Sequence, residues 1–548
     1  MTLVCVPIMV EDPEAALRDA MLAREHGADL VELRVDLLFE DRDEHDALEA
    51  RIDRVLDLVA RSPAPCIVTC RPAWEGGEYA GIDADRVALV EALGKSETPP
   101  SYIDIEIATL DLDASLRARI RASVAGTTDE TTDKPRLICS AHDFQGRPST
   151  LTRTILAMHD EPACSVVKIA YRARSIRDNL ELFDILRDRR KPTIALAMGR
   201  FGLMSRVLAP KFGAFLTFAS LRDESATAPG QPTLDELLNL YRFRSIGPGT
   251  KVYGVMGWPI EHSMSPLVHN TGFGRIGFDG VYLPLPIEPS AESFKATTLA
   301  LLDHQPLDFS GASVTIPHKT HLVQLASSDA SLGCTLDPDI RAAGAANTLC
   351  VRDPDTEHDE RSLSLHNTDA IAVATLLVEA LGPLQGNTVL IVGAGGAARS
   401  AAFGCAGRGA KVLIYNRTRE RAQSIVDDLI AADLAGTLAV AETPAVHTDA
   451  YINATPVGMK GGPDPEGLPI PIPSLGSRSD RLVVLDMVYN PIETPLIRAA
   501  KRHGYHTIDG VRMFARQAKV QFGLWTGAEP PTGLFGGLVR DALRVNNE

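Results

Sequence analysis

Residues 388–418 place the tightest constraint on what this chain can fold into. They begin with an apolar, β-branched run, Val389 to Val392, which is typical of a strand buried on both faces. A Gly-x-Gly-x-x-Ala turn follows, and its small residues permit a tight turn, a close approach of a phosphate and close packing of the next helix. A second apolar run, Lys411 to Tyr415, follows at strand–helix–strand distance. This region is therefore predicted to bind the pyrophosphate of a nucleotide at a helix N-terminus.

The residues after the second strand select the nucleotide. A free ribose 2′-hydroxyl usually meets an Asp or Glu about 20 residues beyond the glycines. This chain instead has Asn416, Arg417 and Thr418 there, with Arg421 one turn further on. Amide donors and cations favour a 2′-phosphate, so we expect a Rossmann lobe that binds NADP(H). The alternative is an ordinary solvated helix start capped by Thr418.

Composition excludes several classes of protein. The 548 residues are too many for one core and suggest three or four domains. A net charge of −16 argues against a nucleic-acid partner. Because no signal-peptide pattern and no apolar run of about 18 residues occur, we expect a cytoplasmic protein without a membrane partner. Most cysteines lie in apolar runs, and Cys66 and Cys70 lack a second ligand pair, so free thiols and no metal site are expected.

Residues 1–242 alternate strand-like and amphipathic helix-like segments. Eight such units over roughly 250 residues are typical of a (β/α)8 barrel, and a long doubly wound sheet is the alternative. The predicted strands are 3–9, 30–36, 66–71, 102–107, 136–142, 165–170, 193–198 and 215–219.

In such a barrel the chemistry lies at the carboxyl ends of the strands. Lys168 stands inside a predicted strand, so it is at least partly desolvated whichever way it points. Desolvation favours the neutral amine, the form that attacks a ketone to make a Schiff base. His142, one strand away, is a candidate acid/base for removing a proton α to a carbonyl and expelling a β-hydroxyl. The alternatives are a lysine reaching the rim to meet a carboxylate, and a purely structural histidine.

Six motifs span this region: Glu32-Leu33-Arg34-Val35-Asp36, Arg71 with Glu75-Gly76-Gly77, Ser140-Ala141-His142-Asp143-Phe144, Lys168-Ile169-Ala170, Met198-Gly199 with Ser205-Arg206, and Ala228-Pro229-Gly230-Gln231. Together they resemble the type I 3-dehydroquinate dehydratases. The resemblance implies that Lys168 forms an imine with the substrate ketone, that His142 shuttles protons, and that Glu75 helps to position or protonate it. Arg206 would bind the substrate carboxylate. Residues implied to hold hydroxyls and order the site are Glu32, Arg34, Arg71 and Gln231, and Thr227 replaces an expected serine in the closing loop.

The Gly and Pro residues of segment 243–250 break helix and strand alike and predict a linker. We therefore expect a barrel at 1–242 and a substrate-binding lobe at 251–365, completed by C-terminal helices at about 514–548. The Rossmann NADP lobe would occupy 366–513.

The predicted substrate lobe carries polar residues in its loops. Ser263 and Ser265 precede a helix and could bind a polyhydroxy acid, although helix capping explains one of them equally well. Lys319 and Asp369 form a candidate acid/base pair for interconverting an alcohol and a ketone beside a nicotinamide. A surface ion pair is the alternative for these two residues.

Further motifs in this half are Ser313-Val314-Thr315-Ile316-Pro317-His318-Lys319, Gly344-Ala345-Ala346-Asn347-Thr348, His366-Asn367-Thr368-Asp369, Asn453 to Met459, Asp486 to Pro491, and Gly510 through Met513 to Gln517. They resemble the shikimate dehydrogenases over about 251–527. The resemblance implies that Lys319 and Asp369 are the catalytic pair. Implied substrate-binding residues are Ser263, Ser265, Thr315, Asn347, Asn367, Tyr489 and Gln517. Implied NADP-binding residues are Gly393, Ala394, Gly395, Gly396, Ala397, Asn416, Arg417, Thr418, Arg421 and Gly510.

Three departures from that second family concern Ala346, where valine is expected, Ala370, where glycine is expected, and an acidic insert at 353–361. The two alanines could alter loop packing near the substrate. The insert is polar, so we expect an exposed turn.

Both families in this order resemble the bifunctional dehydratase–dehydrogenases of the shikimate pathway, which leads to aromatic amino acids. The implied reactions are 3-dehydroquinate to 3-dehydroshikimate, then reduction by NADPH to shikimate. The expected partners are these small molecules, and the sequence does not define an oligomeric state. One alternative is a second half that uses quinate and NAD. Another is a regulatory or binding protein built from inactive copies, which the presence of both catalytic lysines argues against.

Overall fold

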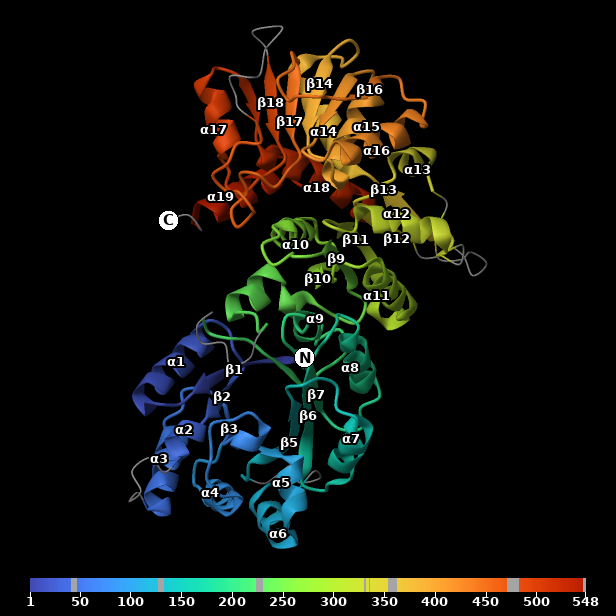
Figure 1. The fold of residues 1–548 in the computed structure, drawn as a ribbon. Coiled ribbons are helices and arrows are strands. Elements are labelled where there is room, and N and C mark those ends of the chain that lie inside the picture. The colour runs from blue at the N-terminus through green and yellow to red at the C-terminus, as the bar shows by residue number, and fades with distance from the viewer. Residues whose placement is uncertain are drawn as a thin grey trace. The chain divides into compact units, whose positions relative to one another are not determined.

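The computed structural model describes residues 1–40, 47–126, 133–222, 230–329, 332–334, 336–352, 362–470 and 482–545. The chain divides into two compact units, Met1–Thr250 and Lys251–Glu548. Figure 1 labels their helices and strands. Thr227 and the acidic insert at 353–361 lie outside the described residues.

The first unit is a barrel of parallel strands. Its eight strands follow the order β7-β6-β5-β4-β3-β2-β1-β8. The backbone N–H of Phe215, just before β8, donates to the carbonyl of Thr193 in β7 over 2.8 Å and brings the two ends of the sheet together. The (β/α)8 prediction is therefore confirmed and the open doubly wound sheet is excluded. The strands are β1 (Leu3–Met9), β2 (Leu30–Arg34), β3 (Cys66–Thr69), β4 (Tyr102–Glu106), β5 (Arg136–Asp143), β6 (Cys164–Arg172), β7 (Thr193–Met198) and β8 (Leu216–Phe218).

Helices surround these strands (Figure 1) because each presents an apolar face to them. In α1, for example, Ala16, Ala20 and Ala23 are buried at helical spacing, and the Asp12 carboxylate caps the first turn. The helices of this unit are α1 (Pro13–Glu25), α2 (Asp36–Phe39), α3 (Leu48–Ala60), α4 (Asp83–Lys95), α5 (Ile107–Leu112), α6 (Ala114–Ser123), α7 (Leu151–Asp160), α8 (Asp178–Arg187) and α9 (Leu203–Val207), with short turns η1 (Ala73–Glu75), η3 (Glu236–Leu240) and η4 (Phe243–Ser245).

The barrel interior changes from apolar to polar along the strands. Near their amino ends, an interior cluster includes Leu30, Ile67, Ile138 and Val166. Because side chains of a strand alternate between faces, the residue two positions further on faces the same way. Those positions hold Glu32, Thr69, Ser140 and Lys168. A polar layer therefore lies above an apolar floor, toward the carboxyl ends of the strands.

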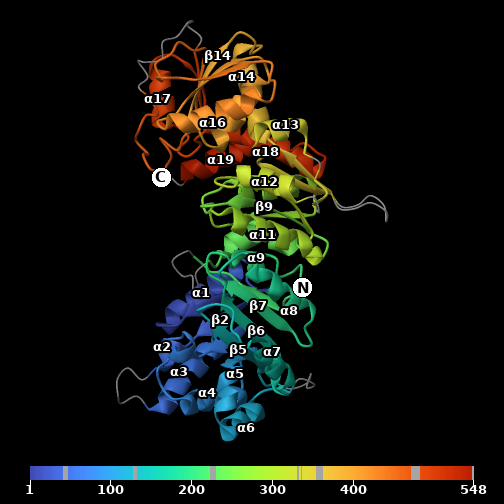
Figure 2. The ribbon, with the colours of Figure 1, turned by 45° about the vertical axis from the view of Figure 1, so that its right-hand side comes forward.

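The second unit begins with a mixed sheet in the order β10-β9-β11-β12-β13. Strands β9 (Lys251–Gly257), β10 (Gly280–Pro286) and β11 (Phe309–Val314) are parallel, whereas β12 (Thr348–Arg352) and β13 (Ser362–His366) run antiparallel. The C-terminal helices α18 (Gly510–Thr526) and α19 (Leu534–Val545) share an aromatic-rich core with this sheet (Figure 2). The other helices of this lobe are α10 (Ser265–Ile276), α11 (Ala291–Asp303), η5 (Gln305–Leu307), α12 (Lys319–Ser328) and α13 (Pro338–Ala343).

A six-stranded parallel sheet forms the rest of the unit, in the order β16-β15-β14-β17-β18-β19. This is the doubly wound nucleotide-binding order, and it confirms the predicted Rossmann architecture. Val389 and Ile391 of β14 face one apolar cluster, while Leu390 and Val392 face another, which explains the unbroken apolar run. The elements are β14 (Thr388–Val392), β15 (Lys411–Tyr415), β16 (Thr437–Val440), β17 (Ala450–Asn453), β18 (Val483–Asp486), β19 (His506–Ile508), α14 (Thr368–Leu381), α15 (Gly396–Ala406), α16 (Arg419–Ile430) and α17 (Pro495–Arg502).

No helix of the described residues is long and apolar enough to cross a membrane. Seven of the eight cysteines are buried, and Cys334 is half-buried.

Candidate active sites

Lys168 lies at the centre of the polar layer of the barrel. Its Nζ donates to Asp104 Oδ2 over 2.6 Å and to Glu32 Oε1 over 3.2 Å, and it lies 4.8 Å from the ring centroid of Phe218. Only 3% of the residue is exposed. The lysine therefore points into the barrel and does not reach the rim. Its burial follows the sequence prediction, and the two carboxylates that contact its Nζ were not part of that prediction.

Glu32 is held as a carboxylate by the same cluster. Burial alone would raise its pKa, but the positive charges of Lys168, Arg71 and Arg34 lower the pKa to about 2. The Thr69 hydroxyl also donates to Glu32 Oε1 over 2.7 Å. Glu32 is therefore an anion that can accept a hydrogen bond from a hydroxyl.

His142 and Glu75 form a second pair at the carboxyl end of the barrel. The backbone N–H of His142 donates to Glu75 Oε1 over 2.6 Å, and the His142 Nδ1 lies 3.7 Å from the same oxygen. Burial lowers the pKa of His142 well below its usual value, and the charges of Arg71 and Lys168 add to this effect. Burial raises the pKa of Glu75 to about 8, with Glu106 adding to the rise. At neutral pH the imidazole is neutral and the carboxyl carries a proton, as a proton-exchanging pair requires.

Asp36 holds both Arg34 and the backbone of Arg71 in place. This aspartate is part of the first dehydratase motif, but no role was assigned to it from the sequence. Arg34 donates through Nε and Nη2 to the two oxygens of Asp36, over 3.1 and 2.6 Å. Asp36 also accepts from the backbone N–H groups of Arg71 and Glu78, each over 3.2 Å. One fully buried carboxylate therefore joins the end of β2 to the loop after β3.

Arg206 in α9 is buried beside β8, where its carbonyl accepts from the Thr217 hydroxyl. Burial lowers the pKa of Arg206 to about 10, and its Nε has no hydrogen-bond partner among the described residues. A buried cation with an unused donor suits a carboxylate ligand. No contact among the described residues places Arg206 in the Lys168 cluster itself. Gln231 is half-buried, directly after the point where the described chain resumes at residue 230.

In the second unit, Lys319 at the start of α12 and Asp369 at the start of α14 form a direct ion pair. Their side chains are only 12% and 7% exposed, so a surface ion pair does not describe them. A Cβ atom added at Gly396 would lie 3.3 Å from Lys319. The glycine-rich turn and the candidate acid/base pair are therefore neighbours.

A buried amide and hydroxyl network surrounds this pair. Asn347 donates to the Thr368 hydroxyl over 3.0 Å and to Gln517 Oε1 over 3.5 Å. Asn367 caps α14 and donates to the Ala345 carbonyl over 2.9 Å. Three predicted substrate-binding residues, Asn347, Asn367 and Gln517, thus converge from β12, β13 and α18.

The two alanines that depart from the family pattern are both buried at this place. The backbone N–H of Ala346 donates to the Lys319 carbonyl over 3.0 Å, and that of Ala370 donates to the Asn367 side chain over 3.1 Å.

Ser263 lies on the loop before α10, whereas Ser265, which was expected on the same loop, is the first residue of the helix. Ser263 Oγ accepts from the backbone N–H of Ser265 over 3.3 Å, so Ser263 does satisfy a helix-start donor. Tyr489 makes a hydrogen bond with the backbone of Met264, between the two serines. Thr315 is half-buried directly after β11, and its backbone N–H bonds the Met256 carbonyl.

The nucleotide turn lies where the strand order of the sheet reverses, between β14 and β17. Gly393 has a φ of 120°, and a Cβ there would lie 2.8 Å from the Ala454 carbonyl oxygen, so glycine is required. Nothing lies within 4 Å of a Cβ placed at Gly395, and no side chain caps α15. This open, uncapped helix N-terminus fits a pyrophosphate. Gly510 has another reason to be glycine, because its Cβ would lie 2.1 Å from the Val488 carbonyl oxygen.

The predicted 2′-phosphate residues Arg417, Thr418 and Arg421 are exposed after β15, with Asn416 half-buried. Asn416 donates to the Thr418 carbonyl over 2.8 Å. Thr418 occupies the N-cap position of α16, but its hydroxyl makes no capping hydrogen bond. The capping alternative therefore does not account for Thr418, and the two arginines remain open to solvent.

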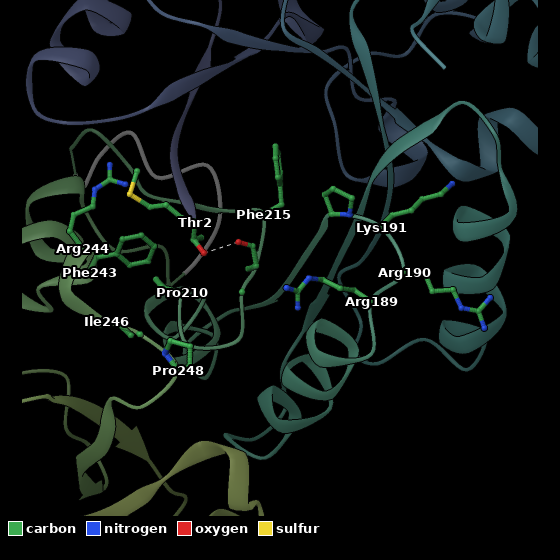
Figure 3. A pocket seen from close by; sticks show the side chains of 15 residues that line it. Thr2, Arg189, Arg190, Lys191, Pro210, Phe215, Phe243, Arg244, Ile246 and Pro248 are labelled. Atoms are coloured by element: carbon green, nitrogen blue, oxygen red, sulfur yellow. Dashed lines mark hydrogen bonds between the residues drawn. The ribbon is translucent and has the colours of Figure 1, made fainter. Parts of the chain in front are cut away.

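A cavity of about 680 Å³ lies at the opposite end of the barrel. Figure 3 shows its lining, which includes Thr2, Lys191 and Phe215, the residues that precede or begin β1, β7 and β8. Two of its cations hold the backbone in place, since Arg189 donates to the carbonyl of Phe212 and Lys191 to that of Glu161. Barrel enzymes place their chemistry at the carboxyl ends of the strands, so we do not assign this cavity as the active site.

Family models match both units. Residues 4–248 match the model described as type I 3-dehydroquinase. Residues 255–349 match a shikimate dehydrogenase substrate-binding domain, and residues 375–456 match shikimate/quinate 5-dehydrogenase. A bifunctional 3-dehydroquinate dehydratase/shikimate dehydrogenase of Arabidopsis thaliana is 34% identical, over 97% of this chain and 83% of the relative. The chain belongs to this bifunctional family.

Other relatives match the dehydrogenase unit. An NADP(+) shikimate dehydrogenase of Methanocella arvoryzae is 36% identical, over 53% of this chain and 99% of the relative. A solved shikimate dehydrogenase in complex with NADP+ is 31% identical, over 54% of this chain and 97% of that chain, with a TM-score of 0.47. The members of this bifunctional family join a dehydratase and a shikimate dehydrogenase of the shikimate pathway, and this chain is an enzyme with both units.

Several residues of the sites were not identified from the sequence. In the dehydratase unit, Asp104, Ser140 and Asp36 form hydrogen bonds within the polar layer. In the dehydrogenase unit, Gln521 bonds Thr348 and Ser313, which extends the network of Asn347. For Asp104, the available indication was a charged residue within an apolar strand.

Proposed function

We propose that the first unit dehydrates 3-dehydroquinate to 3-dehydroshikimate through a Schiff base on Lys168, and that the second reduces the product to shikimate with NADPH. The observation that carries this proposal is a buried lysine amine in a barrel, between two carboxylates, near a neutral histidine and a protonated glutamic acid. The proposed domain boundaries are those expected from the sequence, with the linker at 243–250.

For the dehydration, the amine of Lys168 attacks the substrate ketone and water leaves, which gives a protonated imine. The imine makes the neighbouring C–H more acidic, and the neutral imidazole of His142 removes that proton. The β-hydroxyl then leaves as water with a proton from the His142–Glu75 pair. Hydrolysis of the imine releases the product and restores the amine. Arg206 holds the substrate carboxylate, and Glu32, Arg34 and Arg71 hold its hydroxyls.

For the reduction, Gly393 to Ala397 would hold the pyrophosphate of NADP(H), while Asn416, Arg417, Thr418 and Arg421 would hold its 2′-phosphate. NADPH supplies the hydride. Lys319 donates a proton to the carbonyl oxygen as it becomes an alcohol, and Asp369 positions the ammonium group for this transfer. Asn347, Asn367 and Gln517, with Ser263, Ser265, Thr315 and Tyr489, hold the substrate ring.

The decisive experiment mixes purified protein with NADPH and 3-dehydroquinate alone and follows the fall in NADPH absorbance. Oxidation of NADPH requires both reactions in order. Lys168→Ala should abolish this signal but leave the signal with 3-dehydroshikimate, whereas Lys319→Ala should abolish reduction and leave dehydration. Each variant is the control for the other, because the unaltered unit reports that the chain is intact.

Other outcomes would assign other functions. A signal only with 3-dehydroshikimate would mean an inactive barrel. Turnover of quinate with NAD in place of shikimate with NADP would reassign the second unit. Silence with every substrate would leave a regulatory or binding role.

A further inference from the structure

Asp104 in β4 is the nearer of the two carboxylates that contact the Lys168 amine, at 2.6 Å against 3.2 Å for Glu32. Asp104 is 1% exposed, and its Oδ1 accepts a hydrogen bond from the Ser140 hydroxyl over 2.5 Å. We propose that Asp104 is the catalytic proton acceptor that converts the Lys168 ammonium into the attacking amine and returns the proton as the imine forms. This inference rests on the Schiff-base function proposed above.

A proton acceptor is needed because an ammonium group has no lone pair with which to attack a ketone. Lys168 is buried between two carboxylates, and its Nζ is within ion-pair distance of both. Water has little access, since the lysine side chain is 4% exposed. The proton must therefore pass to a group already in contact with Nζ, and the described contacts offer Asp104 and Glu32.

The surroundings of the two carboxylates differ. Glu32 faces the cations Arg71 and Arg34, and together with Lys168 these lower its pKa to about 2 after the opposing effect of burial. A carboxylate stabilised in this way is a poor proton acceptor.

Asp104 has a different set of neighbours. Its negative charge is among those that raise the pKa of Glu75 and of Glu106, for both of which burial is the largest cause. Two carboxyl groups therefore lie near Asp104: Glu75 on the β3 side and Glu106 in β4. On the β2 side, Arg34 interacts electrostatically with Asp104. The hydrogen bonds of Arg34, however, go to both oxygens of Asp36. From β5, its partner is the neutral Ser140 hydroxyl. Apart from Lys168, the described groups that interact with the Asp104 charge are thus two carboxyls and one arginine, whereas Glu32 faces three cations.

The transfer balances without any other reactant. The Lys168 ammonium gives its proton to Asp104, leaving an amine and a carboxylic acid. The amine adds to the ketone, and the N–H proton moves to the former carbonyl oxygen to give a carbinolamine. Asp104 then protonates that hydroxyl, the C–O bond breaks, water leaves, and the nitrogen lone pair forms the protonated imine. The carboxylate of Asp104 ends beside the positive nitrogen, and the net change is ammonium plus ketone to protonated imine plus water.

The test is Asp104→Asn in the full-length protein, which keeps the size and the hydrogen-bond acceptor but removes the basic oxygen. The rate of imine formation is measured by rapid quenching with borohydride after mixing with 3-dehydroquinate, with the reduced adduct on the chain detected by mass. We expect a fall on the order of 100-fold near pH 7 with little change in KM. The remaining rate should rise about tenfold per pH unit, because hydroxide must now deprotonate Lys168, while the wild-type rate stays flat.

Glu32→Gln is the matched comparison, since it removes the other carboxylate on the same amine. It should raise KM, and its imine-formation rate at saturating substrate should stay flat with pH. Ser140→Ala should change the rate less than about tenfold, because the Asp104 carboxylate remains.

Several outcomes would overturn the inference. One is an Asp104→Asn rate within about threefold of wild type with a flat pH profile. Another is the pH-dependent loss appearing in Glu32→Gln instead. If Asp104→Asn traps no imine at any pH, Asp104→Glu decides: a partial return of trapping supports the carboxylate role, and no return overturns it. Absence of trapping in the wild-type protein would instead refute the Schiff-base function itself.

Discussion

Glu75→Gln tests the electrostatics of the dehydratase site through stability. The Glu75 side chain is 10% exposed, and burial raises its pKa from 4.5 to about 8. Glutamine reproduces the protonated carboxyl: its carbonyl oxygen can accept from the His142 N–H, and its amide replaces an oxygen that already lacks a partner. The substitution therefore changes the titration of this site with little change in shape.

The sign of the change in unfolding free energy follows from whether the folded or the unfolded state binds the Glu75 proton more tightly. A carboxyl whose folded pKa lies above its unfolded pKa contributes stability that is fully present below the unfolded value and is lost as pH rises through the folded value. Since one pKa unit corresponds to about 1.4 kcal/mol, the span from 4.5 to about 8 corresponds to ~5 kcal/mol. Wild type and variant should be equally stable near pH 4. The variant should be the more stable by ~3 kcal/mol at pH 7 and by ~5 kcal/mol above pH 8.

Differential scanning calorimetry at several pH values measures this difference. For a unit of this size 1 kcal/mol moves Tm by about 2–4 °C, so the transition of the first unit should rise by roughly 6–12 °C at pH 7. The transition of the second unit is the internal control and should not move. A difference that is constant with pH, or a variant less stable than wild type at pH 7, would refute the assignment of a protonated Glu75.

Two further predictions concern a buried ion pair and the nucleotide. Arg86 is 1% exposed and pairs with the fully buried Glu106, so Arg86→Met should destabilise the first unit by about 3–5 kcal/mol because a buried carboxylate loses its partner. The loss, measured by urea unfolding, should shrink as pH falls and Glu106 takes up a proton; a loss independent of pH would contradict this cause. Arg417→Ser should raise KM for NADPH about 10- to 100-fold and leave KM for NADH unchanged, because one charge-assisted hydrogen bond to the 2′-phosphate is removed. Equal changes for both nucleotides in steady-state assays would count against that contact.

Much of the fold follows from local patterns. All eight barrel strands lie within a few residues of their predicted bounds, and β1 and β7 match the prediction at both ends. Their short apolar runs are separated by amphipathic helix-like segments, and this contrast defines each strand. Strand β10, one of the strands for which no prediction was made, contains Pro284 and Pro286, which normally argue against a strand. It is tolerated because β10 is the edge of its sheet, a fact of the tertiary structure alone.

The sites were less completely predictable. Asp104 was missed because a single aspartate in an apolar strand does not reveal which face it occupies. The Glu32, Lys168 and His142 positions were named from their motifs, but their contacts join residues as much as 136 positions apart. Closure of the barrel creates those contacts, and no local pattern contains them.

The surroundings of the Lys168 amine show what the sequence determines and what the tertiary structure adds. Its place in an apolar parallel strand is a property of the sequence, and burial follows from that place because such strands are covered on both faces. Whether burial leaves a neutral amine or a paired ammonium depends on what converges on Nζ. In the folded barrel, β2 and β4 bring Glu32 and Asp104 to that atom. The sequence by itself determined that the lysine would be desolvated, and only the tertiary structure decided which carboxylates would contact its amine, since Coulomb interactions depend on distance in space and not along the chain.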